Sequence, residues 1–239
     1  MVLEIIVWVD CCFIIMQLDI KEQSLILEGK KYSRKELMSL SANATGDNTS
    51  SFLLDLYRFL ADWFSDSPFM TVHTSGSTGT PKVLTVRKEQ MMQSARMTCE
   101  FLNLHTGDTA LLCMPLQYIA GKMMVVRALV AGLNLILRTP SGHPLADVTV
   151  PLRFVAMVPL QVFNTLQVLR EKERLCHTDI LIIGGGAIDA ALENEIRLLP
   201  GEIYSTYGMT ETLSHIALRR LNGSSASPYY RPFSSVELS

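Results

Sequence analysis

The sequence lacks a large excess of charge of either sign. Its 239 residues carry 21 basic and 23 acidic side chains, fairly evenly mixed, for a net charge of −2. Binding to nucleic acid or to an anionic membrane needs clustered basic charge, so neither partner is indicated. Because 48% of the residues are hydrophobic, the chain can bury a core, and a small-molecule site is the expected kind of function.

Cysteine patterns that build disulfides or metal sites are also missing. The five cysteines include no C-x-x-C pair, and most lie in apolar runs where a reduced thiol behaves as a small hydrophobe. We therefore expect a reduced, cytoplasmic protein. Neither these cysteines nor the other histidines have the spacing of zinc ligands, so no structural metal is expected. The residues concerned are Cys11, Cys12, Cys99, Cys113, Cys176, His73, His105, His143 and His177.

A membrane-spanning or targeting segment is not indicated either. The apolar run at residues 1–16 has no basic start, contains Glu4 and Asp10, and is shorter than the roughly 20 residues that a spanning helix needs. We expect it to form a buried strand or helix, without membrane insertion. Internal repeats and low-complexity tracts are absent as well.

The patterns that are present alternate between strand and helix. A strand is expected at 24–27, a helix from the capping-box sequence at 33–36 to residue 40, a linker at 41–51 and a helix at 53–64. Further strands are expected at 69–73, 83–87, 109–114, 134–137, 153–157, 179–183, 202–206 and from 233, and further helices at 89–104, 121–130, 160–175 and 189–199. This alternation predicts an α/β fold, mostly parallel sheets flanked by helices, with ligands beyond the carboxyl ends of the strands.

The chain is expected to divide into a partial N-terminal subdomain at 1–67 and a core at 68–239. Residues 139–151 contain three prolines and a glycine and are the candidate boundary within that core.

One loop, residues 74–82, combines hydroxyl side chains, two glycines and a lysine between two apolar runs. Glycines let the backbone approach an anion, N–H groups and hydroxyls donate to phosphate oxygens, and an ammonium offsets charge. The loop is not a Walker A motif, because only two residues separate Gly76 from Gly79 and Thr80-Pro81 precedes Lys82. By itself, this composition is equally typical of a flexible surface loop.

A second motif, Tyr207-Gly208-Met209-Thr210-Glu211-Thr212, follows a predicted strand. The tyrosine offers a flat face to a nucleobase, Gly208 permits a sharp turn, Thr210 can donate to a phosphate, and Glu211 is a hard oxygen ligand suited to magnesium. Alone, the hexapeptide could equally be a loop with a helix cap.

Together these motifs resemble the adenylate-forming superfamily of acyl-CoA synthetases, luciferases and peptide-synthetase adenylation domains. Residues 74–82 resemble its phosphate-binding signature and 207–211 its Tyr-Gly-x-Thr-Glu motif. Residues 115–121 resemble its Pro-Leu-aromatic-His-x-x-Gly segment, and the three glycines at 184–186 resemble its adenine-bordering turn. The resemblance covers about residues 69–220 and implies the large N-terminal domain of that fold.

The resemblance implies ATP, Mg²⁺ and coenzyme A as cofactors or co-substrates. The phosphate-loop residues would be Thr74, Ser75, Gly76, Ser77, Thr78, Gly79 and Lys82, and the adenine site would include Gly184, Gly185, Gly186, Tyr207 and Gly208. Thr210 would contact the phosphate under attack and Glu211 would hold magnesium. Lys82, Thr210 and Glu211 are thus the expected catalytic residues.

The chain departs from the family pattern in two ways. Tyr118 stands where many relatives have His, which puts a cationic substrate contact there in doubt. Nothing downstream matches the ribose-binding aspartate, the hinge or the C-terminal lysine, so we expect the small C-terminal lid domain to be absent and the chain alone to bind adenylates poorly.

Within the family, residues 115–122 and 208–215 most resemble o-succinylbenzoate-CoA ligases of menaquinone biosynthesis. The implied substrate has a second carboxylate, and the candidate substrate residues are Tyr118, Gly121, Lys122, Ser214 and His215. Lys122 could instead be solvated and His215 could fill an ordinary strand position. Other functions that stay open are a ligase for another aryl or fatty acid and a non-catalytic fragment that binds a nucleotide or acyl group. A homo-oligomer is also open.

Overall fold

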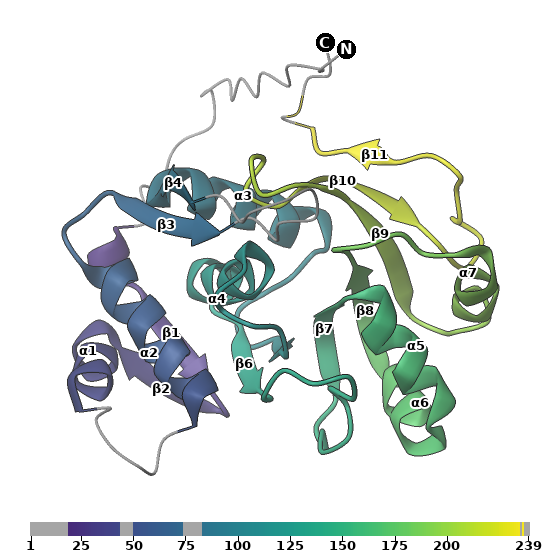
Figure 1. Ribbon diagram of the computed structural model, residues 1–239, viewed down its shortest axis with the longest axis horizontal. Coiled ribbons are helices and arrows are strands. Elements are labelled where there is room, and N and C mark those ends of the chain that lie inside the picture. Colours follow the sequence, from purple (N-terminus) through teal and green to yellow (C-terminus); the bar gives the residue numbers. More distant parts are fainter. Residues whose placement is uncertain (1–18, 44–49, 74–82, 235, 237–239) are drawn as a thin grey trace.

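The computed structural model describes residues 19–43, 50–73, 83–234 and 236 (Figure 1). The predicted element at 1–16 and most of the predicted linker at 41–51 lie outside this range. Within it, no helix combines the length and the apolar character needed to cross a bilayer.

Nine strands form one sheet, in the order β11-β10-β9-β8-β7-β5-β6-β1-β2. They are β1 (Ser24–Leu27), β2 (Lys30–Ser33), β5 (Thr109–Leu112), β6 (Asn134–Leu137), β7 (Leu152–Met157), β8 (Thr178–Ile183), β9 (Glu202–Gly208), β10 (His215–Arg220) and β11 (Arg231–Pro232). From β1 to β9 along this order the neighbours pair in parallel, whereas β2, β10 and β11 pair antiparallel at the two margins. The predicted α/β class is confirmed.

Helices cover both faces of the sheet. Side chains alternate between the faces along each strand, so in β7 Phe154 and Ala156 join one apolar cluster while Val155 and Met157 join the other. The first cluster includes residues of α3 (Lys88–Phe101) and α4 (Ile119–Ala131). The second includes residues of α5 (Pro159–Gln167), α6 (Leu169–Cys176) and α7 (Ala190–Ile196).

Side chains of the N-terminal elements extend the first cluster. They are a 3₁₀ turn at Ile20–Glu22, α1 (Arg34–Asn43) and α2 (Ser51–Phe64). The predicted capping box is confirmed, because the Ser33 N–H donates to the Glu36 carboxylate at 2.8 Å and the Glu36 N–H donates to Ser33 Oγ at 3.4 Å. Trp63 is fully buried and donates its indole N–H to Gln23 Oε1 at 2.8 Å.

Two predictions of secondary structure were wrong. The helix expected at 160–175 is two helices, because Val168 is extended (φ −114°, ψ 113°). Its buried positions Val162, Thr165 and Leu166 are followed by Glu171 and Leu175, out of phase with one continuous stripe. The final strand lies at 231–232 instead of beginning at Phe233, although the Phe233 N–H still donates to Ile216 O.

The predicted division into 1–67 and 68–239 stays a prediction, as does the boundary near 139–151. The latter segment connects β6 to β7, and β5 pairs with both of these strands. Likewise β1, from the predicted N-terminal part, pairs with β6.

Candidate active site

The site is built from segments that follow the carboxyl ends of the central strands. Tyr118 comes after β5, the glycine turn 184–186 comes directly after β8, and the Tyr207–Gly208 pair ends β9. Because parallel strands end at a common edge, these segments are the ones expected to meet a ligand.

The predicted phosphate loop, with Thr74, Ser75, Gly76, Ser77, Thr78, Gly79 and Lys82, lies outside the described residues. Its flanks form a hairpin of β3 (Phe69–His73) and β4 (Val83–Arg87), in which His73 is opposite Val83. His73 also forms a parallel bridge with Tyr118. The hairpin therefore brings both ends of the loop to the segment that follows β5.

The glycine turn fits closely against its neighbours. A Cβ on Gly184 would lie 2.4 Å from Thr206 Oγ1 of β9, and Gly185 has a φ of +77°, which disfavours other residues. The Gly184 N–H donates to Met157 O at 3.1 Å. Gly185 and Gly186 are exposed, so a ligand can approach this backbone.

The turn after β9 is held by the side chain of Thr212. Its hydroxyl accepts from the Met209 N–H at 3.0 Å and donates to Ser214 O at 2.6 Å. Gly208 is required here, because a Cβ would lie 2.3 Å from Ser214 O. Thr212 thus closes the turn.

Tyr207 is 49% exposed and Glu211 is exposed, while Thr210 is half-buried. Glu211 can offer one carboxylate to a metal. The described residues contain no group of three or more His, Cys, Asp or Glu side chains that could hold one. A single carboxylate fits Mg²⁺, which binds through one or two carboxylates together with substrate phosphates.

Two of the predicted substrate residues make structural contacts. Gly121 is buried at the start of α4, where a Cβ would lie 2.4 Å from Pro115 O. Lys122 donates its ammonium to Thr71 O at 2.6 Å, which ties α4 to β3, and burial lowers the pKa of Lys122. Their role in substrate binding stays a prediction, as does that of Tyr118, whose side chain is 40% exposed.

Ser214 and His215 lie at the start of β10 beside a residue that the sequence analysis missed. Arg127 of α4 donates from Nη2 to Ser214 Oγ at 2.7 Å. His215 Nδ1 is 3.3 Å from the same hydroxyl, and its Nε2 is 3.1 Å from Thr98 Oγ1. Burial, with a smaller effect from Arg127, holds the pKa of His215 well below its usual value of 6.5, so the ring is neutral.

Arg127 is a buried cation without a carboxylate partner among the described residues. Its side chain is only 2% exposed, and its Nε–H has no hydrogen-bond acceptor in that part of the chain. Burial lowers the pKa of Arg127 to about 10, so it stays charged at neutral pH. A buried charge is normally paired. The signal available in the sequence was the single charge in the apolar run 123–130.

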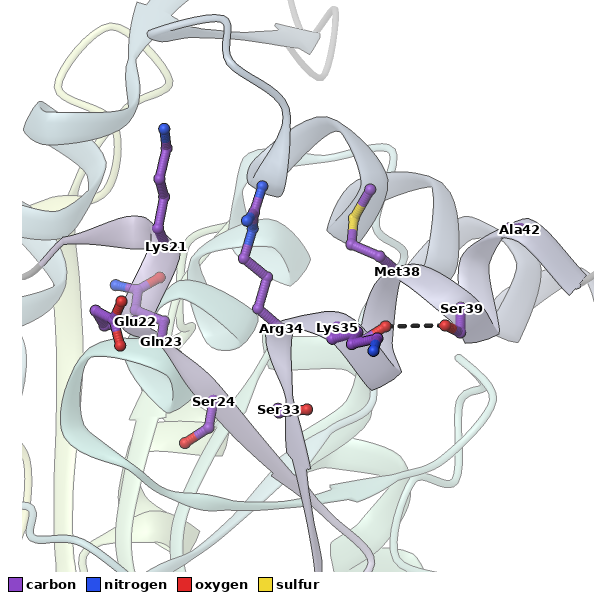
Figure 2. Close-up of a pocket in the computed structure, with 10 residues that line it drawn as sticks. All are labelled: Lys21, Glu22, Gln23, Ser24, Ser33, Arg34, Lys35, Met38, Ser39 and Ala42. Carbon is purple, nitrogen blue, oxygen red and sulfur yellow. Dashed lines mark hydrogen bonds between the residues drawn. The ribbon is translucent and has the colours of Figure 1, made fainter.

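One cavity lies away from these segments. It has a volume of about 740 Å³ and lies between the 3₁₀ turn and α1, where Lys21, Arg34 and Lys35 contribute to its lining (Figure 2). Ser24, which also lines it, starts β1, and β1 runs parallel to β6. The cavity is therefore at the amino-terminal edge of the sheet, opposite the candidate site.

A comparison with protein families gives a match that covers most of the chain. The model of the AMP-binding enzyme family matches residues 10–238. The chain belongs to this family. Membership of the AMP-binding family confirms the resemblance carried by residues 69–220.

Curated members of the AMP-binding family are similar to this chain over part of their length. The 2-succinylbenzoate–CoA ligase of Haemophilus influenzae is 29% identical over 168 residues, which is 70% of this chain and 36% of that protein. The enzyme of the same name from Enterococcus faecalis is 31% identical over 61% of this chain and 30% of that protein. The chain thus spans about a third of the length of these relatives.

Solved structures of the family share the fold. An acyl-CoA synthetase (AMP-forming)/AMP-acid ligase II-like protein from Dyadobacter fermentans has a TM-score of 0.75 and 35% identity, covering 82% of this chain and 56% of that one. The O-succinylbenzoate coenzyme A synthetase from Bacillus subtilis, in complex with ATP and magnesium ion, has a TM-score of 0.62 at 17% identity, covering 91% and 64%. The second similarity concerns the fold alone.

Proposed function

We propose that the chain is the nucleotide- and acid-binding part of an AMP-forming acid–CoA ligase. The observation that carries this proposal is the exposed Tyr207–Glu211 turn at the end of β9, beside a glycine turn whose Gly184 packs against Thr206 of the same strand. A flat aromatic face, an open glycine backbone and an exposed carboxylate are the groups that an adenine and a magnesium-bound phosphate chain require.

In the proposed reaction, a substrate carboxylate attacks the α-phosphorus of ATP, and pyrophosphate leaves. The thiolate of coenzyme A then displaces AMP to give the thioester. Tyr207 stacks on the base, Thr210 donates to the phosphate under attack, and Lys82 and its loop hold the outer phosphates. Glu211 would hold a magnesium ion, whose charge would offset the negative charge of the phosphates that otherwise repels the carboxylate.

For the acid, we propose an aryl substrate with a second carboxylate, o-succinylbenzoate being the first choice. Arg127 supports this choice, because a buried cation that lacks an anionic partner among the described residues is well suited to a ligand carboxylate. Ser214, already hydrogen-bonded to Arg127, would share the contact. The neutral His215 would serve as a hydrogen-bonding neighbour and not as a second cation.

Pyrophosphate release tests the reaction. We expect it to depend on an acid, with o-succinylbenzoate preferred over benzoate and a fatty acid, either in this chain or in a longer protein that contains it. Release with benzoate or fatty acids alone would contradict the choice of acid. No acid-dependent release from either protein would contradict the ligase and favour a non-catalytic binding fragment.

The Arg127→Met variant tests the carboxylate contact. The loss of a charge-assisted hydrogen bond costs about 1.5–3 kcal/mol, so the KM for o-succinylbenzoate should rise about 10- to 150-fold while the KM for ATP is unchanged. An apolar replacement of a buried ion is often tolerated by the fold, and thermal unfolding checks this. Arg170→Met, on the exposed side of α6, is the matched control. An unchanged KM for the acid would refute the assignment.

A further inference from the structure

The candidate adenine platform has an aromatic neighbour from a distant part of the sequence. Tyr230 lies between β10 and β11, and its ring centroid is 5.6 Å from that of Tyr207, with the ring planes tilted by 54°. Tyr207 is 49% exposed and Tyr230 is 40% exposed. Because the two rings are close and tilted, a base cannot insert between them as it would between parallel rings. The contact therefore packs one ring against the other.

Tyr230 is itself held at two points. Its hydroxyl is hydrogen-bonded to Ser205 Oγ of β9 at 2.8 Å, and the guanidinium carbon of Arg219 lies 5.7 Å from its ring centroid. Ser205 is buried and precedes Tyr207 by two residues. Tyr230 is therefore anchored to the same strand whose end carries the platform.

Arg219 is fixed in turn by α7. It donates to both carboxylate oxygens of Glu193, at 3.1 and 2.8 Å. Hydrogen bonds from Arg219 and Arg197 lower the pKa of Glu193 to about 2, so this ion pair persists over the whole neutral range. A bidentate pair holds the guanidinium in one plane, which keeps its position against the Tyr230 ring.

We propose that Tyr230 is a positioning residue that fixes the Tyr207 ring for stacking on the adenine of ATP. A half-exposed tyrosine that rotates about χ1 and χ2 must be ordered before a base can stack on it, and that ordering weakens binding. The tilted contact with an already anchored ring orders Tyr207 in advance. This inference rests on the proposed function, because it takes Tyr207 as the adenine platform.

The test compares ATP dissociation constants of three variants with that of the wild-type protein. An aromatic pair contributes about 0.5–1.5 kcal/mol, so Tyr230→Leu should raise the dissociation constant about 2- to 12-fold. Tyr230→Phe keeps the ring and should therefore bind ATP with most of the wild-type affinity. Tyr229→Leu is the matched control, because Tyr229 is adjacent and 79% exposed, and it should bind ATP as the wild type does.

A double-mutant cycle separates positioning from general stability. If Tyr230 acts through Tyr207, then Tyr230→Leu should have no further effect on ATP binding in a Tyr207→Leu background. In acid-dependent pyrophosphate release, Tyr230→Leu should raise the KM for ATP and leave kcat within about twofold. If Tyr230 has a purely structural role, Tyr230→Leu should lower the melting temperature in both backgrounds. The ATP dissociation constant, measured at a temperature where the protein is folded, should then be unchanged.

The outcomes for the two proposals are distinct. Wild-type ATP affinity in Tyr230→Leu, equal effects in both backgrounds, or no binding of ATP by the wild type would overturn the positioning role. Absence of acid-dependent pyrophosphate release from a wild type that still binds ATP would overturn the proposed ligase, and the binding measurements would still decide the role of Tyr230.

Discussion

His215 is a titratable side chain placed where it cannot easily take up a proton. It is buried between Thr98, Ser214 and the ring of Phe233, and the cation of Arg127 is nearby. Burial and that cation lower its pKa below 6.5 in the folded state. The unfolded chain therefore binds a proton near pH 6.5 that the folded chain excludes, so stability is present above this pH and is lost as the pH falls below it.

We expect His215→Gln to flatten this dependence. Between pH 7.5 and 5, the free energy of unfolding of the wild type should fall more steeply than that of the variant, by up to about 1.4 kcal/mol per pH unit. Urea denaturation at several pH values measures the difference. The exposed His105→Gln serves as the control and should follow the wild type. Parallel curves for wild type and His215→Gln would refute the neutral, buried assignment.

At the same scale, the sequence predicted the residues whose chemistry is local and missed those defined by distant contacts. The motif at 207–211 predicted a nucleotide site only together with the loop at 74–82, and the three glycines at 184–186 predicted an adenine-bordering turn through their resemblance to the family. These site residues stay predictions. Arg127 is a single charge in an apolar run of the sequence, but its place in the site depends on β10, which brings Ser214 to it across 87 residues. Tyr230 becomes noticeable only because the chain returns to β9 after β10.

The turn between β9 and β10 depends on the absence of a side chain. In this antiparallel pair Gly208 is opposite His215, and a Cβ at 208 would lie 2.3 Å from Ser214 O and 2.5 Å from His215 Cα. Both atoms belong to the backbone, which cannot move aside as the end of a flexible side chain can. A larger residue must therefore move the start of β10, which also carries the contacts to Arg127 and Thr98.

Gly208→Ala should accordingly destabilise the protein by about 1–3 kcal/mol, the usual cost of overpacking. Gly186→Ala is the control in the neighbouring turn, because its Cβ would meet Pro159 Cγ and Cδ at ordinary contact distances of 3.6 and 3.7 Å. That change should alter the free energy of unfolding by no more than about 0.5 kcal/mol. Chemical denaturation of both variants gives the comparison, and equal stabilities would contradict the close approach of the two strands.

Elements were predicted well where a short apolar run alternates with a periodic helix, as in the central parallel strands. They were predicted poorly where tertiary contacts decide which face of a helix is buried or whether a segment pairs as a strand. Val168 interrupts a helix because α5 and α6 place their buried residues on different faces. The sequence suggested a strand position for His215 alone and no element for 216–220, because the pairing with β9 that defines β10 is a tertiary contact.

For the whole molecule, the sheet joins two apolar clusters that lie on opposite faces. Trp63 of α2 belongs to the cluster that includes Leu112 and Phe154, whereas Leu181 of β8 belongs to the other. Each central strand contributes to both clusters, so neither face can open while the other keeps its strands in place. This coupling predicts a single unfolding transition that includes residues assigned to both 1–67 and 68–239.

Leu181→Ala tests that coupling across the sheet. Removing a buried leucine side chain costs about 2–5 kcal/mol, and the midpoint of urea unfolding should shift equally by far-UV circular dichroism and by the fluorescence of Trp63. A Trp8→Phe background makes Trp63 the only tryptophan of the chain. Leu198→Ala, at a side chain that is 86% exposed, should shift neither signal. Leu181→Ala could instead lower the midpoint measured by circular dichroism and leave the midpoint measured by Trp63 fluorescence unchanged. The N-terminal part would then unfold as a separate unit, because its apolar contacts with α3 and α4 would persist without the strands on which those helices pack.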